Sequence, residues 1–236
     1  MTVDGLDGVS TLMFDFYGTI VDMQSGLAEA LGPYLRAKGS SLEPGRVVTW
    51  WRRTHFEASM IDALLDRDHT PYREIGQQAV DFTLERAGIP HTPEEVAELV
   101  AAIERLRPFP DVVKALTKLR AHGYALVVLS NGDPDMLERG VPYSGTAHLF
   151  DRVISVAEAG AFKPHVGTYR TACALSGLTA NEVLFVANHA FDCVGAKAYG
   201  MRTAFVDRRR RPFGNATYPP DLVVRDFYEL AEVLTA

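Results

Sequence analysis

Side chains able to do chemistry stand where apolar segments of the chain end, and Asp15 is the first of them. It lies near the end of an apolar run, and Gly18 and Thr19 follow it as a tight bend. A buried carboxylate is costly unless a partner or a reaction uses it. Taken alone, Asp15 is either a turn-capping residue or a nucleophile.

Two further segments supply groups that can hold an anion. Ser130 and Asn131 end a second apolar run and precede Gly132. A hydroxyl and backbone N–H groups in such a loop can bind an anion, although Ser-Asn-Gly is also common turn chemistry. Lys163 precedes a proline and a predicted helix. A lone lysine is ordinarily a surface residue, but this one belongs to a third loop on the same side.

A fourth apolar run ends in a crowded polar turn that contains Asn188, His189 and Asp192. His189 could be structural, and a carboxylate in a first helical turn such as Asp192 is favoured by the helix dipole. Four successive segment ends carrying Asp, Ser-Asn, Lys and Asn-His-x-x-Asp are far less expected by chance than any one alone. Together they predict one polar site in which Asp15 is the nucleophile.

The elements that must position these residues form a doubly wound, Rossmann-like α/β core with a parallel sheet. Continuous apolar runs, rather than alternating ones, predict strands covered by helices on both faces. Helices are predicted over residues 111–122, 165–176 and 190–199, each followed by a glycine that can end it. The predicted strands are residues 11–16, 124–130, 152–156, 182–187, 202–207 and 222–224.

Residues 23–106 interrupt this alternation with an all-helical insertion. The last predicted helix opens with Thr92-Pro93-Glu94-Glu95, a capping box with proline at the first helical position. We predict a cap domain of residues 23–106 and a core domain of residues 1–22 and 107–236. Ligands of open parallel sheets bind beyond the carboxyl ends of the strands, where this insertion would form a lid. Its helices are predicted over residues 27–37, 44–66, 72–87 and 92–106.

The formal net charge of −6 argues against a general nucleic-acid partner, because no overall positive field collects phosphates. The run 208–211 of four arginines is either a solvated loop or an anion-facing rim. Cys173 and Cys193 are too few for a disulfide framework, which indicates a reducing cytoplasm. We also expect no signal peptide at the start of the chain and no membrane segment.

The segment from Asp15 to Asp22, with Ser130-Asn131-Gly132, Lys163-Pro164 and residues 188–192, resembles the four motifs of the haloacid dehalogenase (HAD) superfamily. Phosphatases of that superfamily usually carry a second aspartate two residues after the nucleophile, where this chain has Tyr17. They also use an acidic metal ligand where this chain has Asn188. The resemblance is therefore to the L-2-haloacid dehalogenases.

This resemblance implies that Asp15 displaces halide from a small (S)-2-haloacid and that water hydrolyses the resulting ester to an (R)-2-hydroxyacid. No metal and no cofactor are implied. Trp51-Arg52 resembles the family pair whose arginine faces the halogen, although the adjacent Arg53 leaves the register open by one residue. The implied catalytic residues are Asp15, Thr19, Arg52, Lys163 and Asp192. The implied substrate-binding residues are Phe16, Tyr17, Ser130, Asn131, Tyr169, Asn188, His189 and Phe191.

The fourth motif departs from the family pattern. Ala187 replaces a serine, His189 replaces an amide, and Phe191 replaces a tryptophan. We hypothesise that His189 donates to the halide or acts as base for the water, and that Asp192 helps to orient this water. Three alternatives stay open: a relative acting on another 2-substituted acid such as azetidine-2-carboxylate, a HAD phosphatase, and a non-catalytic ligand-binding protein. A homodimer through the cap helices is also expected.

Overall fold

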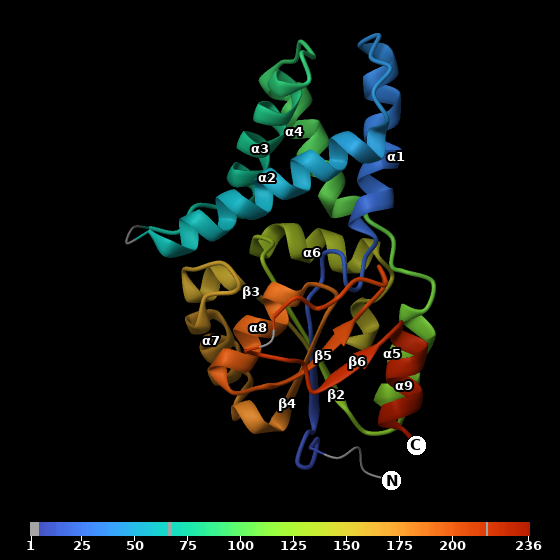
Figure 1. Ribbon diagram of the computed structural model, residues 1–236, viewed down its shortest axis with the longest axis vertical. Helices are drawn as coiled ribbons and strands as arrows, with labels where there is room; N and C mark the ends of the chain where they lie inside the picture. Colours follow the sequence, from blue (N-terminus) through green and yellow to red (C-terminus); the bar gives the residue numbers. More distant parts are fainter. Residues whose placement is uncertain (1–4, 66–67, 216) are drawn as a thin grey trace.

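Six short apolar segments pair into one parallel sheet in the computed structural model, which describes residues 5–65, 68–215 and 217–236. The strand order is β3-β2-β1-β4-β5-β6 (Figure 1). The order confirms the predicted doubly wound α/β fold. The strands are β1 (Thr11–Phe14), β2 (Ala125–Ser130), β3 (Arg152–Ser155), β4 (Val183–Ala187), β5 (Arg202–Val206) and β6 (Leu222–Val224).

The central strand β1 is two residues shorter than predicted, and its end shapes the site. All four of its residues are buried, and Asp15 N–H still donates to Val186 O at 3.1 Å. The backbone then turns, because Phe16 O accepts the N–H groups of Ile20 and Val21 at 3.0 and 3.1 Å. Apolarity continues through Phe16 although the strand does not, so the hydrophobic pattern alone extended the prediction too far.

Helices cover both faces of the sheet. The chain winds outward from β1 to β3, returns to β4 and winds outward again, and right-handed crossovers then place the two sets of helices on opposite faces. Helix α5 (Val112–Ala121) packs on α9 (Phe227–Leu234), and α7 (Val166–Ser176) packs on α8 (Ala190–Tyr199). The glycines predicted to end α7 and α8 adopt the left-handed conformation, with φ of 67° at Gly177 and 112° at Gly200.

Two core helices, α6 (Pro134–Tyr143) and α9, were not predicted. Pro142 lies within α6, and a proline there hides a helical pattern in the sequence. Helix α9 has only eight residues. Short 3-10 helices complete the connections at η1 (Ala102–Arg105), η2 (Ala147–Leu149), η3 (Val156–Ala159) and η4 (Ala180–Glu182).

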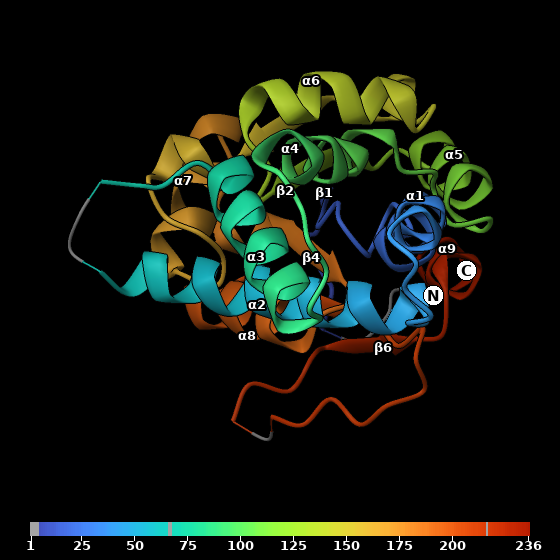
Figure 2. The same cartoon turned by 90° about the horizontal axis from the view of Figure 1, so that it is seen from above.

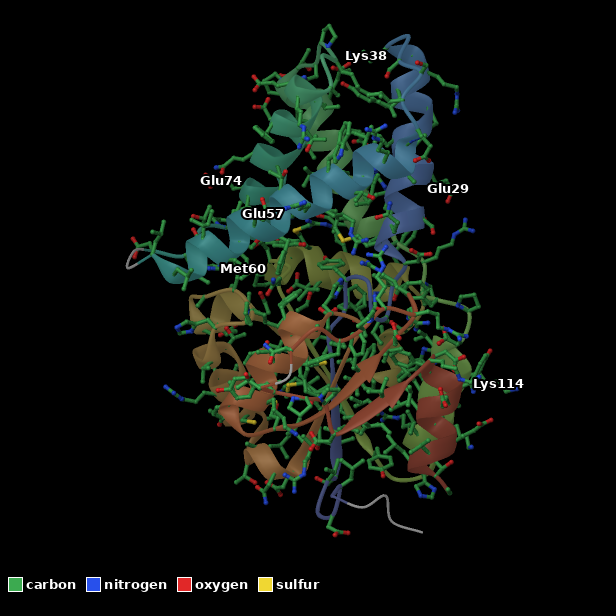
Figure 3. All side chains as sticks on the ribbon, viewed as in Figure 1. Glu29, Lys38, Glu57, Met60, Glu74 and Lys114 are labelled. Carbon is green, nitrogen blue, oxygen red and sulfur yellow. The ribbon has the colours of Figure 1, made fainter. Side chains whose placement is uncertain are left out.

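The insertion is helical, as predicted, and lies beyond the carboxyl ends of the strands (Figures 1 and 2). Its first helix begins at Met23, four residues earlier than predicted, and its last α-helix ends at Ala101 and continues as the 3-10 helix η1. The predicted capping box is present, with Thr92 accepting from Glu95 N–H and Glu95 accepting from Thr92 N–H. The exposed Glu29, Glu57 and Glu74 lie on the outside of this group (Figure 3). Asp66, the predicted end of the second helix, lies outside the described residues. These helices are α1 (Met23–Ala37), α2 (Pro44–Leu64), α3 (Tyr72–Arg86) and α4 (Pro93–Ala101).

The two chain crossings between the core and these helices lie side by side. Asp22 N–H donates to Arg107 O at 2.9 Å, and Phe109 N–H donates to Ile20 O at 3.0 Å. A second tie comes from Asp133, whose carboxylate accepts the N–H groups of Tyr72 and Arg73 at 2.8 and 2.9 Å at the start of α3. The division into two domains stays a prediction. Within the described ranges, no helix is long and apolar enough to cross a membrane.

Candidate active site

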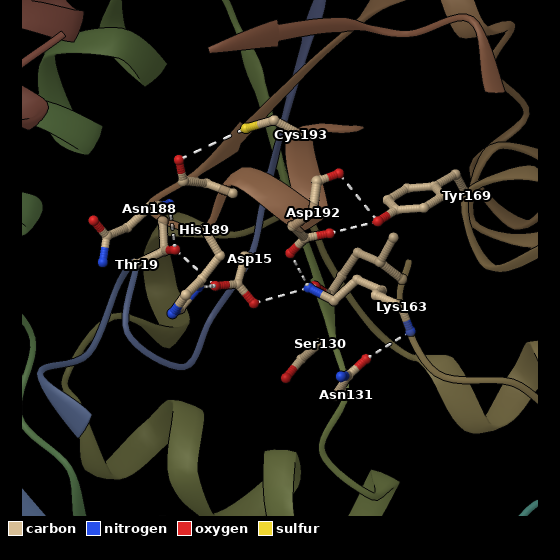
Figure 4. Close-up of polar contacts among 12 residues, drawn as sticks. Asp15, Thr19, Ser130, Asn131, Lys163, Tyr169, Asn188, His189, Asp192 and Cys193 are labelled. Carbon is tan, nitrogen blue, oxygen red and sulfur yellow. Dashed lines mark hydrogen bonds and ion pairs between the residues drawn. The ribbon is translucent and has the colours of Figure 1, made fainter. Parts of the chain in front are cut away.

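The candidate site lies where the strand order reverses, outside the carboxyl ends of β1, β2 and β4. Asp15 follows β1, Asn131 follows β2, and Asn188 and His189 follow β4. A parallel sheet opens a crevice at such a reversal because neighbouring connections leave in opposite directions. Figure 4 shows the predicted polar side chains of these strand ends gathered there around Asp15.

Asp15 is held by three polar groups and is only 6% exposed. Lys163 Nζ donates to Asp15 Oδ1 at 2.8 Å, and Thr19 Oγ1 donates to Asp15 Oδ2 at 2.6 Å. His189 Nδ1 lies 3.4 Å from the same Oδ2. Burial acts to raise the pKa of Asp15, but the Lys163 ammonium and His189 more than offset it, so the pKa lies well below its ordinary value. Asp15 is therefore an ionised carboxylate near neutral pH.

Lys163 is fully buried between two carboxylates. Besides Asp15, its Nζ donates to Asp192 Oδ2 at 2.7 Å and to Leu129 O at 3.0 Å. Burial lowers its pKa, but the two carboxylates raise the pKa by more. An ammonium has three N–H groups, and all three are used here. Lys163 thus supplies charge to the site and has no N–H group left to donate to a substrate carboxylate.

Asp192 lies behind Lys163 rather than facing the crevice. It is fully buried, and Tyr169 Oη donates to its Oδ1 at 2.6 Å. Burial raises the pKa of Asp192 even though Lys163 opposes this change. This position suits holding Lys163 in place, whereas the expectation that Asp192 orients the water is not supported by any exposure to the crevice.

Thr19 is fixed from the β4 side, because Asn188 N–H donates to Thr19 Oγ1 at 3.0 Å. Asn188 Nδ2 also donates to Gly18 O at 3.0 Å. Gly18 has φ of 89°. A Cβ at this position would lie 2.8 Å from His189 Cε1 and 3.2 Å from Arg52 Nη2. Only glycine therefore lets the cap arginine and His189 approach the same point beside Asp15, a role that the sequence analysis did not assign.

A cavity of about 570 Å³ opens above Asp15, between the strand ends and the cap. About half of the predicted site residues line it, and the others lie beneath them as buried supports. The predicted residues that line the cavity are Asp15, Tyr17, Arg52, Asn131, Lys163, His189 and Phe191. The supporting residues are Phe16, Thr19, Ser130, Tyr169, Asn188 and Asp192.

The structure resolves the register of the arginine pair in the cap. Arg52 is partly buried, its Nη1 donates to Gln24 Oε1 at 3.0 Å, and its Nη2 lies over Gly18. Burial lowers its pKa below the ordinary value. The side chain of Arg53 is 78% exposed and pairs with Glu57 at 2.8 Å, although it also borders the cavity mouth. Arg52 is thus the arginine beside Asp15.

Several cap residues on the cavity wall were missed. Helical spacing could have found part of the set, because residues three and four positions after Arg52 share its face. The Phe56 and Phe191 ring centroids are 4.2 Å apart, so a cap aromatic and the predicted core aromatic meet. Among the described residues, Tyr17 Oη and His55 Nδ1 have no hydrogen-bond partner. The missed cap residues are Met23, Gln24, Thr49, His55, Phe56, Ser59 and Tyr72.

Metal-binding potential was searched over residues 5–65, 68–215 and 217–236, where no group of three or more His, Cys, Asp and Glu is arranged to hold an ion. Between Asp15 and Asp192 stands the ammonium of Lys163. The positive charge that holds these two carboxylates together is thus part of the chain itself.

Comparisons with known proteins agree with this arrangement. Residues 9–200 match the haloacid dehalogenase-like hydrolase family. A (S)-2-haloacid dehalogenase of Xanthobacter autotrophicus is 34% identical over 85% of this chain and 76% of its own length. Another, from Pseudomonas sp. (strain YL), is 27% identical over 97% and 95%. The solved structure of the Xanthobacter autotrophicus L-2-haloacid dehalogenase with chloropropionic acid covalently bound has a TM-score of 0.84 at 29% identity, covering 95% and 98%.

Proposed function

The chain belongs to the haloacid dehalogenase-like hydrolase family, and on that premise we propose that it hydrolyses small (S)-2-haloacids to (R)-2-hydroxyacids through an ester on Asp15. The observation that carries this proposal is the ionised Asp15, held by Lys163 and Thr19 at the floor of the cavity. Without an acid at position 17 to protonate a leaving alcohol, this carboxylate suits displacement at carbon better than phosphoryl transfer. The reaction needs no cofactor.

In the first step, a carboxylate oxygen of Asp15 attacks the α-carbon, the carbon–halogen bond breaks, and halide leaves with the bonding electrons. Lys163 keeps the nucleophile ionised and in one orientation. Arg52, on the cap side of the cavity, stabilises the leaving halide by its charge. Phe56 and Phe191 exclude water around it, which strengthens that interaction.

The substrate carboxylate is assigned to the opposite wall. Asn131 Oδ1 accepts the backbone N–H of Lys163 at 3.1 Å, and this contact turns the side-chain amide toward the cavity as a donor. The backbone N–H groups of Phe16 and Tyr17, where the chain turns after β1, are the further donors we assign. Asn188 supports this turn by donating to Gly18 O, and Ser130 Oγ accepts the backbone N–H of Gly132 in the loop after β2.

In the second step, water attacks the Asp15 carboxyl carbon, the bond from that carbon to the ester oxygen breaks, and the 2-hydroxyacid leaves with an oxygen of Asp15. One proton is released. His189 is the basic group on the cavity side of Asp15, with Nδ1 at 3.4 Å. We assign to His189 the acceptance of this proton, in the place where the family carries an amide. Asp192 and Tyr169 act through Lys163 as positioning residues.

Halide release tests the proposal. Chloroacetate and both enantiomers of 2-chloropropionate are incubated with the wild-type protein and with Asp15→Asn, with and without EDTA. We expect EDTA-insensitive release from the (S)-enantiomer and none from the variant. Phosphate release from an aryl phosphate that EDTA abolishes, without halide release, would instead establish a phosphatase.

A single turnover in H₂¹⁸O separates the ester route from direct attack by water. The ester route leaves the first hydroxyacid unlabelled and puts ¹⁸O into the Asp15 peptide. Label in the first product would refute the covalent intermediate. Azetidine-2-carboxylate is a further test substrate. Opening of its ring, without halide release from any haloacid, would point to the related hydrolase that acts at carbon.

We also propose a cytoplasmic homodimer. The free thiols Cys173 and Cys193 are both buried, which suits a reducing compartment. At the end of α2 and just beyond it, Ile61, Leu64 and Leu65 are large apolar residues that are at least half exposed. Light scattering of the wild-type protein and of Leu64→Glu tests the dimer, because a charge there would favour the monomer.

A further inference from the structure

Arginines that the dehalogenation mechanism does not use line the mouth of the cavity. Arg209 and Arg211 border the cavity beside Arg52 and Arg53. The cavity volume of about 570 Å³ falls in the range of roughly 300–1,000 Å³ that holds drug-sized ligands. A three-carbon haloacid would fill only part of it. Space and positive charge are therefore both present beyond what such a substrate needs.

The turn that carries these arginines is held in place at the mouth of the cavity. Arg208 anchors it, because Nη1 donates to both carboxylate oxygens of Asp111 at 3.0 and 2.9 Å. Asp207 closes it, accepting the backbone N–H of Arg210 at its carbonyl and that of Arg211 at Oδ1, at 3.3 and 2.9 Å. Arg209, Arg210 and Arg211 are all exposed, but Arg209 and Arg211 border the cavity and Arg210 does not. The side chains thus alternate, with 209 and 211 toward the cavity.

The charge of Arg209 and Arg211 is not neutralised by the protein. Arg53 pairs with Glu57 and Arg208 with Asp111. Across the described ranges, no recorded ion pair includes Arg209 or Arg211. Asp22 acts on Arg209 only through its field. Two neighbouring guanidinium groups at the cavity mouth can therefore bind a carboxylate from outside through charge-assisted hydrogen bonds.

We infer that Arg209 and Arg211 bind a second carboxylate of the substrate, so that the preferred substrates are 2-halogenated dicarboxylates such as (S)-2-chlorosuccinate. This inference rests on the proposed function. The reaction is the same: the Asp15 oxygen–carbon bond forms, chloride leaves, and water releases (R)-malate from the ester. The α-carboxylate binds at the strand ends, and the distal carboxylate reaches the arginine turn.

The test compares two substrates in three proteins. The ratio of kcat/KM for (S)-2-chlorosuccinate to that for (S)-2-chloropropionate is measured for the wild type, for the double variant Arg209→Gln/Arg211→Gln, and for Arg210→Gln. The last removes one charge from the same turn without facing the cavity. We expect a wild-type ratio above one, a fall of about 10-fold or more in the double variant, as for loss of a charged hydrogen bond, and no change in Arg210→Gln.

Three outcomes would overturn the inference. A wild-type ratio below one would show that the arginines do not select a dianion. An equal fall for both substrates in the double variant would leave the ratio unchanged and assign the arginines to general attraction of anions. A fall of the ratio in Arg210→Gln as large as that in the double variant would also assign the arginines to general attraction of anions.

A binding measurement separates this failure from that of the proposed function. Calorimetric titration with (R)-malate and (R)-lactate needs no turnover. Tighter binding of malate that the double variant loses supports the second carboxylate site even if halide release fails. Halide release from 2-chloropropionate with equal binding of malate and lactate would sink this inference alone.

Discussion

Replacing Lys163 by methionine removes the cation between two buried carboxylates. At an effective dielectric constant of about 20, each contact, at 2.8 Å to Asp15 and 2.7 Å to Asp192, provides about 6 kcal/mol of attraction. The dehydration of the ammonium offsets most of this. Breaking a buried pair by removing one partner typically costs about 3–5 kcal/mol, because a charge stays buried without compensation. We expect a destabilisation of that size.

The contribution of Asp15 to the pH dependence of stability should also change sign. In the wild type, the lowered pKa of Asp15 adds stability that is present above the unfolded value of 3.8 and is lost as the pH falls. In Lys163→Met, burial acts on Asp15 and Asp192 without the ammonium and raises both pKa values. The variant should therefore lose stability as the pH rises above about 3.8, and Asp192→Asn added to it should recover part of the loss.

Urea unfolding at several pH values, followed by circular dichroism and tryptophan fluorescence, measures both effects. Lys197→Met is the matched control, because Lys197 pairs with Asp221 at 2.5 Å but both side chains are partly exposed. Such a pair is worth about 1 kcal/mol or less. A loss in Lys163→Met no greater than that of the control would refute the charge balance described for the site.

Three further changes test other parts of the site. Arg52→Gln should lower kcat about 10²- to 10³-fold, as removal of a charge-stabilising donor does. The control Arg53→Gln should change kcat less than about 3-fold. Equal effects of the two variants in steady-state assays would contradict the assignment of Arg52 as the arginine beside Asp15. Gly18→Ala should destabilise the fold by about 1–3 kcal/mol, because residue 18 has a positive φ. It should also lower kcat by displacing His189. A melting curve and a rate like those of the wild type would count against the close contact between residue 18 and His189. Burial lowers the pKa of His55 to about 3 from 6.5, so the folded state loses stability as the pH falls from 6.5 towards 3. His55→Phe should make the free energy of unfolding depend less on pH in this range. An unchanged pH dependence in urea titrations would argue for a charged His55.

The sequence predicted most of the core because its signals there are local. Continuous apolar runs and left-handed glycines such as Gly177 are visible along the chain. The chemistry-bearing residues at the strand ends were found for the same reason, since topology brings the ends of parallel strands together. Helix α6 was missed because Pro142 contradicts its local pattern.

The sequence did not indicate which side chains of the site border the cavity and which lie buried behind them. The sequence placed Asp192 and His189 in one turn but did not indicate that the first lies behind Lys163 and the second beside the cavity. That difference depends on packing against Tyr169, which is distant along the chain. Part of the cap wall was missed for a related reason: Tyr72 joins the cavity wall only once α3 packs against α2.

The paired crossings at Asp22–Arg107 and Ile20–Phe109 have a consequence for how such a chain can diversify. Because the chain leaves and re-enters the core at neighbouring points, everything between them can be lengthened, shortened or exchanged without moving the sheet. The nucleophile and its lysine lie on the core side of this junction, as does Phe191, whereas Arg52 and Phe56 belong to the exchangeable side. The two walls of the cavity are thus encoded in separable stretches of the gene, and a graft at residues 22 and 107 should exchange the cap wall without rebuilding the site around Asp15.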